Sequence, residues 1–261
     1  MVTVIVLGGS GLLGKAMIKE LNQYQDFRTY GTHLANPTGL TPERSLRLDI
    51  GDLAGLRAIL TTLWPDLVIS ALRGDFGQQL VFHGEIADYL KENGGRLYFF
   101  STANVFDNDL TKPHDEDDLP NSRSEYGQFK ITCERRLVEL LGDKACILRL
   151  PQVWGKHSQR LDSLRKSLKN NEKIAVYPNL FISAISDQFA AEKAVYIIRH
   201  NLKGIFHLAA EDIVNHRDFY TQLIAGLGYN QPVLEENPDE SGYFALVSKR
   251  NNEFPSKTFS Q

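Results

Sequence analysis

The opening of the chain, where an apolar segment leads through glycines into a helical pattern, constrains the fold more than any other feature. Residues 1–7 are mostly β-branched and apolar, which is typical of a buried strand. Glycines follow at positions 8, 11 and 14, and residues 15–21 place apolar side chains at helical spacing. We predict a sharp exit from the strand at Gly8, close approach of backbone amides to a ligand at Gly11 and tight helix–sheet packing at Gly14. The helix N-terminus then presents free N–H groups, so the turn predicts a site for nucleotide phosphates.

Strand-like and helix-like segments alternate from this turn to about residue 150. The predicted strands cover 27–32, 46–50, 65–71, 96–102 and 145–150, and the predicted helices cover 52–63, 78–93 and 125–141. This order predicts an α/β fold with a doubly wound, Rossmann-like parallel sheet. Because the pattern weakens after Pro151, we expect a dinucleotide-binding domain over 1–155. Residues 156–261 are expected to form mostly a small substrate-side lobe, with about 186–210 returning to the first domain.

Composition excludes several classes of function. The formal net charge is −3 and no long basic stripe occurs, so nucleic acid is not expected as a partner. No run of about 18 apolar residues occurs, and the chain opens directly on a strand, so neither a membrane span nor a signal peptide is expected. Only two cysteines occur, which favours a reducing compartment. We expect a cytoplasmic protein.

The second predicted strand bears on cofactor preference. In NAD-preferring sites an acid commonly ends this strand and holds the ribose 2′-OH. Here the strand ends Gly31-Thr32-His33, and the next acid is Glu43, which favours NADP over NAD. His33 and Arg44 either face a 2′-phosphate or are ordinary loop residues, and the sequence supports both interpretations equally. Asp49 either bonds the adenine amino group or caps the helix that begins near Asp52.

A hydroxyl, a phenol and an ammonium, which together suit carbonyl reduction, follow one another along the chain. Ser101-Thr102 ends the fifth strand, and Tyr126 and Lys130 lie four residues apart on a predicted helix. That spacing puts both on one helix face, roughly 5–6 Å apart at Cβ. An unperturbed tyrosine, with a pKa near 10, is a weak acid, and a neighbouring ammonium is expected to lower that pKa. The same lysine is positioned to hydrogen-bond a nicotinamide ribose.

Four segments together resemble extended short-chain dehydrogenases/reductases, and most closely the dTDP-4-dehydrorhamnose reductase group. They are Gly8-x-x-Gly11-x-x-Gly14, residues 101–107 (STANVFD), Tyr126-x-x-x-Lys130 and residues 148–155 (LRLPQVWG). The likeness covers about residues 1–155 well and 204–223 more weakly. It implies a nicotinamide cofactor and reduction of a nucleotide sugar at a 4-keto carbon.

The resemblance also assigns residues. It implies catalytic roles for Thr102, Tyr126 and Lys130. The cofactor-binding set is then Gly8, Ser10, Gly11, Leu12, Leu13, Gly14, His33, Asp49, Ile50, Ala71, Leu72, Arg73, Ser101, Tyr126, Lys130, Pro151 and Val153. The substrate-side set is Asn104, Val105, Gln152 and Trp154.

This sequence also departs from the group on the substrate side. Ala103-Asn104 replaces the usual Asp-Tyr, and residues 71–76 differ from the group's small-residue and acidic pattern. Gln152 stands where the group tends to have a tryptophan. Trp154 either packs, which is the favoured interpretation, or stacks on the substrate.

Remaining charged and titratable residues give weaker signals. A basic segment either binds a diphosphate or forms a solvated helix face, the latter slightly favoured. It comprises Arg160, Arg165, Lys166 and Lys169. No metal site is expected, because the histidines show no ligand spacing: His83, His114, His157, His200, His207 and His216.

The sequence therefore predicts an NADP-dependent reductase acting on a ketone, with NAD(H) as the alternative cofactor. Its expected partner is a small molecule of the nucleotide-sugar class, and it is expected to be a monomer or homodimer. Two alternatives remain: a nucleotide-sugar epimerase or dehydratase that uses the same residues, and a regulatory subunit that binds NADP(H) without turnover.

Overall fold

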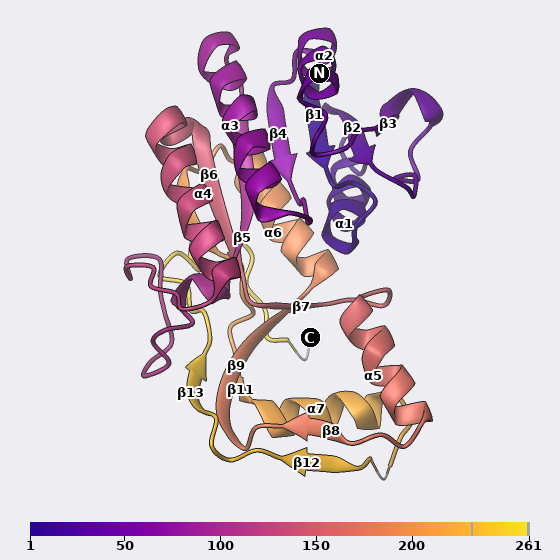
Figure 1. Ribbon diagram of the computed structural model, residues 1–261, viewed down its shortest axis with the longest axis vertical. Coiled ribbons are helices and arrows are strands. Elements are labelled where there is room, and N and C mark those ends of the chain that lie inside the picture. Colours follow the sequence, from indigo (N-terminus) through magenta and orange to yellow (C-terminus); the bar gives the residue numbers. More distant parts are fainter. Residues whose placement is uncertain (231, 260–261) are drawn as a thin grey trace.

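A parallel sheet with helices on both faces forms the larger part of the molecule (Figure 1). The computed structural model describes residues 1–230 and 232–259. The sheet order is β10-β6-β5-β4-β1-β2-β3, and every neighbouring pair is parallel. Its strands are β1 (Val2–Leu7), β2 (Phe27–His33), β3 (Ser45–Arg47), β4 (Leu67–Ser70), β5 (Arg96–Thr102), β6 (Ala145–Leu150) and β10 (Gly204–His207). The predicted fold class is confirmed.

The helices divide between the two faces of this sheet. α1 (Leu12–Leu21) and α6 (Asp187–Arg199) pack against one face, and α2 (Leu53–Leu63), α3 (Phe76–Asn93) and α4 (Glu125–Leu141) cover the other. Two hydrophobic cores result, one beneath each helical layer. Strand β1 contributes alternate side chains to both cores, with Val4 and Ile5 fully buried, which explains its uninterrupted apolar sequence.

A smaller lobe lies opposite the carboxyl ends of the sheet strands (Figure 1). Strand β9 (Asn179–Ser186) is its organising element and pairs with β7 (Gln152–Trp154), β11 (Ile213–Asn215) and β13 (Ser241–Phe244). Strands β8 (Ile174–Val176) and β12 (Leu234–Glu236) form a separate pair, and α5 (Gln159–Lys169) and α7 (His216–Gly226) complete the lobe. The sequence pattern, which weakens after Pro151, did not predict the short strands of this lobe.

The chain crosses between the two parts more than once. After β9 it returns as α6, which packs beside α1, and β10 then joins the sheet beside β6. The lobe has its own core, which includes Trp154, Leu164, Ile182 and Phe219.

Polar side chains cap the N-termini of α2 and α4. Asp52 caps α2, because its Oδ1 accepts a hydrogen bond from the Gly55 amide at 2.8 Å. Asp49 instead accepts from the Gly51 amide and lies beyond the end of β3, so the hypothesis that it caps this helix is wrong. Ser124 caps α4, with its hydroxyl accepting a hydrogen bond from the Gly127 amide at 3.1 Å.

Candidate active site and cofactor cleft

The glycine turn between β1 and α1 is shaped as a phosphate-binding loop. Gly8 has a φ of +74°, and a Cβ there would lie 2.7 Å from the Ala71 carbonyl oxygen. A Cβ on Gly14 would lie 2.2 Å from the Gly8 carbonyl oxygen, so only glycine fits where α1 meets the turn. Gly11 is the N-cap of α1 and offers no side-chain cap, which leaves the first amides of the helix for a ligand. The turn therefore fits a dinucleotide pyrophosphate, with Ser10 in the loop and Leu12 and Leu13 in the first turn of α1.

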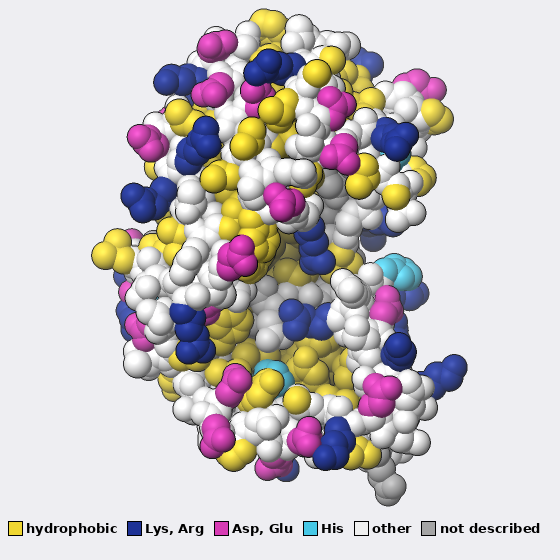
Figure 2. All heavy atoms as spheres, viewed as in Figure 1, with side chains coloured by type: hydrophobic (Ala, Val, Ile, Leu, Met, Phe, Trp, Pro, Cys, Tyr) yellow, Lys and Arg dark blue, Asp and Glu magenta, His cyan; other side chains and the backbone are white. Residues whose placement is uncertain are grey.

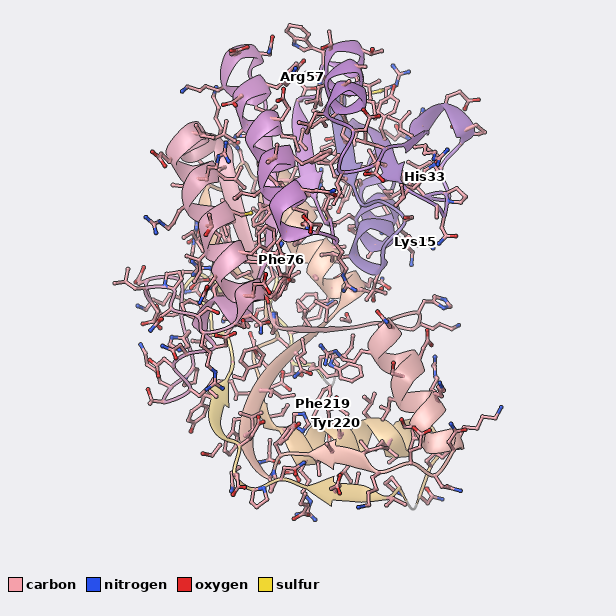
Figure 3. All side chains as sticks on the ribbon, viewed as in Figure 1. Lys15, His33, Arg57, Phe76, Phe219 and Tyr220 are labelled. Atoms are coloured by element: carbon pink, nitrogen blue, oxygen red, sulfur yellow. The ribbon has the colours of Figure 1, made fainter. Side chains whose placement is uncertain are left out.

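The end of β2 lies beside the glycine turn. The Thr32 hydroxyl accepts a hydrogen bond from the Gly8 amide at 3.1 Å, which ties β2 to the glycine turn. His33 follows, and its buried Nδ1 has no hydrogen-bond partner within the described residues. No carboxylate ends this strand. Figure 3 labels His33 and Lys15 on the same side of the sheet domain.

Other predicted cofactor residues lie along the carboxyl edge of the sheet. Ala71 and Leu72 directly follow β4, and their backbone atoms pack against Gly8. Ile50 contacts the next turn, where a Cβ on Gly74 would lie 2.9 Å from its Cδ1. Further along the same edge lie Asp49, Arg73, Ser101, Pro151 and Val153.

Thr102, Tyr126 and Lys130 come together at the junction of β5 and α4. Thr102 ends β5 and is buried, whereas Tyr126, in the first turn of α4, retains 38% exposure. The Thr102 hydroxyl is near enough to lower the pKa of the Tyr126 phenol as a hydrogen-bonding group. The Lys130 Nζ lies 6.0 Å from the centroid of the Tyr126 ring. The structure thus groups the three residues that the sequence analysis placed in one site.

The expected lowering of the Tyr126 pKa is wrong for this structure. Burial raises the pKa of the phenol, and the hydrogen bond with Thr102 and the charge of Arg73 only partly oppose that effect. Lys130 does not provide the expected tuning charge, because its ammonium donates to the Phe100 carbonyl oxygen at 2.9 Å. A raised pKa keeps the phenol protonated at neutral pH, which suits a proton donor.

Lys130 occupies an apolar enclosure. Its side chain is 5% exposed, and its Nζ lies 4.3 Å from the centroid of the Phe99 ring and 5.6 Å from that of Phe129. Burial lowers the pKa of this lysine to about 8, and the charge of Arg73 acts in the same direction. Lys130 is therefore charged at pH 7 and close to its titration point at mildly alkaline pH.

Two residues that sequence reasoning overlooked set the start of α4 and hence the position of Tyr126. Asp107 Oδ1 accepts hydrogen bonds from the Ser122 hydroxyl and the Arg123 amide, each at 2.8 Å, and Asp107 Oδ2 bonds the hydroxyl of Ser124. Gly127 packs so closely that a Cβ would lie 2.3 Å from the Asn104 carbonyl oxygen. The aspartate that closes the STANVFD segment was the available signal for this contact.

Of the predicted substrate residues, Asn104 and Gln152 are partly buried and Val105 and Trp154 are buried. Asn104 accepts a hydrogen bond from the Thr102 hydroxyl at 3.0 Å, and Gln152 is partly buried with an unpartnered Oε1. Val105 is fully buried beneath the site, so its assignment to the substrate is wrong. Trp154 is 4% exposed and packs 5.4 Å from Phe219, which confirms the packing interpretation.

The cleft between the sheet domain and the lobe has aromatic and cationic walls. Figure 2 shows a hollow there in which hydrophobic and Lys or Arg side chains are visible. In Figure 3, Phe76 lies at the sheet-domain side, and Phe219 and Tyr220 lie across from it on α7. The Arg160 guanidinium lies 5.5 Å from the centroid of the Trp154 ring, and its charge lowers the pKa of the Tyr220 phenol against the larger effect of burial.

Within residues 1–230 and 232–259, no group of three or more histidine, cysteine, aspartate or glutamate side chains is arranged to hold a metal ion. No helix in those ranges is long and apolar enough to cross a membrane.

Three features occur together: the glycine turn without a side-chain cap, His33 at the end of β2 with an unpartnered Nδ1, and the group of Thr102, Tyr126 and Lys130. They define a Rossmann-like protein of the short-chain dehydrogenase/reductase type. The chain belongs to the RmlD substrate binding domain family, whose sequence profile matches residues 78–251. The resemblance to dTDP-4-dehydrorhamnose reductases is therefore confirmed.

Individual proteins show the same relationship. The chain is 23% identical over 250 residues to a probable low-salt glycan biosynthesis reductase, Agl14, of Haloferax volcanii, covering 89% of this chain and 82% of that protein. It is 29% identical over 242 residues to methionine adenosyltransferase 2 subunit beta of Danio rerio, covering 80% and 69%. The crystal structure of dTDP-4-dehydrorhamnose reductase from Bacillus anthracis in complex with NADP superimposes with a TM-score of 0.82 at 19% identity, covering 99% and 96%.

Proposed function

We propose that this protein is an NADP-dependent reductase that transfers hydride to a ketone carbon of a nucleotide sugar. The observation that carries the proposal is the grouping of Thr102 and Tyr126 with buried Lys130 one helical turn away, all at the carboxyl edge of the sheet. Membership of the RmlD substrate binding domain family supports this assignment.

The chain's own residues account for the proton in this reaction. NADPH supplies the hydride when it is bound, and the glycine turn with the N-terminus of α1 would hold its pyrophosphate. The Thr102 hydroxyl orients the ketone oxygen toward Tyr126. The Tyr126 hydroxyl donates its proton to that oxygen as the carbon accepts hydride, so a ketone becomes a secondary alcohol. The phenolate then recovers a proton from solvent, and the Arg73 charge and the Thr102 hydroxyl, which lower the pKa of the phenol, stabilise it in the interval.

The end of β2 supports NADP over NAD. A 2′-phosphate needs positive or hydrogen-bonding groups and no nearby carboxylate. His33 has a free buried Nδ1, and Arg44 lies in the short 3₁₀ turn Pro42–Arg44 just before β3. Thermal-shift titrations would test this preference, and a larger shift with NADH than with NADPH would contradict it.

Oxidation of NADPH in the presence of a panel of ketones, including 4-keto nucleotide sugars, tests the main proposal. We expect turnover by the wild-type protein and its loss in Tyr126→Phe, which removes the proton donor and keeps the ring. The proposal fails if no ketone is reduced, or if Tyr126→Phe is as active as the wild type.

A second candidate function is regulatory, and the 29% identity to a protein named as a subunit of methionine adenosyltransferase favours it. In this case the chain would bind NADP(H) and act through a partner enzyme. Tyr126→Phe would then keep full cofactor affinity and full biological activity, whereas a variant of the glycine turn such as Gly14→Ala would lose both.

A further inference from the structure

Phe76 connects the turn after β4 to the catalytic helix. It is the first residue of α3, directly after the N-cap Asp75, whose side chain accepts from the Gln78 amide at 2.8 Å. Its ring stacks on Phe129 with centroids 4.7 Å apart and an interplanar angle of 8°. The same ring lies 5.8 Å from the ring of Tyr126 at 37°. Figure 3 shows Phe76 at the end of α3 that faces the cleft.

These two contacts place Phe76 against the face of α4 that carries the chemistry. Tyr126 and Phe129 are three residues apart and Lys130 follows, so all three side chains share one helix surface. Lys130 is surrounded by the rings of Phe99, Phe129 and Tyr126, and Phe76 covers two of those rings on the side of α3. The ring of Phe76 therefore forms an outer layer of the enclosure.

We propose that Phe76 is a positioning residue: its ring holds the Tyr126 side chain in place and closes the aromatic enclosure around the Lys130 ammonium. The inference rests on the proposed reductase function, to which it adds a residue that touches the catalytic tyrosine from another element. Phe76 lies in the segment where this chain departs from the usual pattern of dTDP-4-dehydrorhamnose reductases, so family membership does not supply the role.

The electrostatics of the enclosure agree with this geometry. Desolvation is the main reason that the pKa of Lys130 falls to about 8. Excluding water from the space beside the Tyr126 hydroxyl and the Lys130 ammonium leaves fewer solvent dipoles to stabilise the charged lysine. Truncating Phe76 would admit water beside both groups, so the Lys130 pKa would rise toward that of a solvated lysine.

The test compares Phe76→Ala with Phe76→Tyr, which retains a ring, and with Val81→Ala as a matched control. Val81 lies on the same helix but is 53% exposed. NMR titration of protein carrying ¹³C-labelled lysine, with the Lys130 signal assigned by comparison with Lys130→Met, reports the lysine pKa without any substrate. NADPH oxidation with a ketone that the wild type reduces reports kcat and KM.

We expect Phe76→Ala to raise the Lys130 pKa and to lower kcat by roughly tenfold to a hundredfold, the range associated with misplacing a catalytic group. Phe76→Tyr and Val81→Ala should match the wild type in both measurements. If Phe76→Ala does not fold, Phe76→Leu fills most of the volume without an aromatic ring and should give a smaller shift in the same direction.

An unchanged Lys130 titration and an unchanged kcat in a folded Phe76→Ala or Phe76→Leu variant would overturn the positioning role. The role is also overturned if Phe76→Tyr is as impaired as the alanine variant. Failure of the wild type to reduce any ketone would overturn the proposed reductase function, and the NMR titration would still decide whether Phe76 closes the enclosure.

Discussion

Two regions of the molecule each bury a lysine, one beside the catalytic tyrosine and one in the middle of α6. Lys130 is 5% exposed and Lys193 is 0% exposed. Each donates a hydrogen bond to a single backbone carbonyl, of Phe100 at 2.9 Å and of Ala209 at 2.7 Å. Burial lowers the pKa of both side chains to about 8.

The two lysines differ in what surrounds them. The Tyr126 ring, one helical turn from Lys130, borders the cleft. Lys193 lies 5.0 Å from the ring centroid of Phe189 and 4.7 Å from that of Phe254, and it joins α6 to the loop after β10 and to the C-terminal segment. The two lysines therefore have similar burial and similar pKa values but different roles. A displaced pKa indicates a functional site only where reactive groups lie nearby.

Replacing each lysine with methionine should give the largest difference in enzymatic activity between the two regions. We expect Lys130→Met to reduce kcat/KM for NADPH-dependent ketone reduction by about 10²- to 10⁴-fold, the contribution typical of acid–base groups. Lys193→Met should keep activity within about threefold of the wild type, because it removes no group from the cleft. Comparable losses in the two variants would show that the catalytic and structural regions are not distinct.

Truncation of Phe254 should destabilise the Lys193 region while sparing the chemistry. Phe254 is 4% exposed, and its ring lies 5.8 Å from that of Phe206. Phe254→Ala creates a cavity and should lower the free energy of unfolding by about 3–5 kcal/mol. Chemical denaturation measures the loss, and activity per folded molecule should remain close to that of the wild type. A fall in kcat with an unchanged free energy of unfolding would contradict the assignment of a structural role to the Lys193 region.

Stability should depend on pH through both lysines with the same sign. Each folded pKa, about 8, lies below the ordinary lysine value of 10.5, so the unfolded state binds the extra proton between these values. The free energy of unfolding therefore rises as pH increases from about 8 to 10.5, by up to ~3 kcal/mol per lysine.

Comparing wild type with Lys130→Met and Lys193→Met isolates these contributions. Burial also raises the pKa of the Cys133 thiol to about 11 and that of the Cys146 thiol to about 12. The comparison with Lys193→Met cancels both contributions, whereas Lys130→Met also removes a charge that lowers the Cys133 pKa. The free energy of unfolding of the wild type should rise relative to that of each variant as pH increases from about 8 to 10.5. A difference between wild type and variant that stays constant would show that the lysine concerned is not buried in its charged form at neutral pH.

The sequence predicted the sheet domain well because local signals there agree with the tertiary fold. Apolar strands, glycine turns and amphipathic helices each have a distinctive period, and residues such as Gly14 are required by close backbone contacts visible as a motif. The lobe was harder, because β7, β8, β11 and β12 are three residues long and too short to show alternation. They exist through pairing with partners distant in sequence, as β12 pairs with β8.

The candidate site was predictable as a set of residues and less so as a set of interactions. Motif spacing identified Thr102, Tyr126 and Lys130, but it could not show that the Lys130 ammonium bonds the Phe100 carbonyl. It also could not reveal Phe76, because contact between α3 and α4 depends on how two helices pack across the sheet. Val105 was misassigned because sequence neighbours of a catalytic residue can point into the core.

The smallest expected effect comes from Glu116, which joins the loop before α4 to the C-terminal segment. Its carboxylate accepts from the His207 amide at 3.0 Å, from the Ser248 hydroxyl at 2.5 Å and from the Lys249 amide at 2.9 Å. Its negative charge also raises the pKa of Lys193, against the larger effect of burial.

Glu116→Gln removes this charge and keeps the side-chain size. The free energy of unfolding should fall by about 1 kcal/mol, since charge-assisted hydrogen bonds become neutral ones. In an NMR titration of ¹³C-labelled lysines the Lys193 pKa should move further down, because one stabilising negative charge has gone. Lys130 should titrate as in the wild type, since Glu116 is not among the groups that shift its pKa. A matching displacement of both lysines would mean that the two regions are electrostatically coupled, and the separation between a catalytic and a structural lysine would then have to be abandoned.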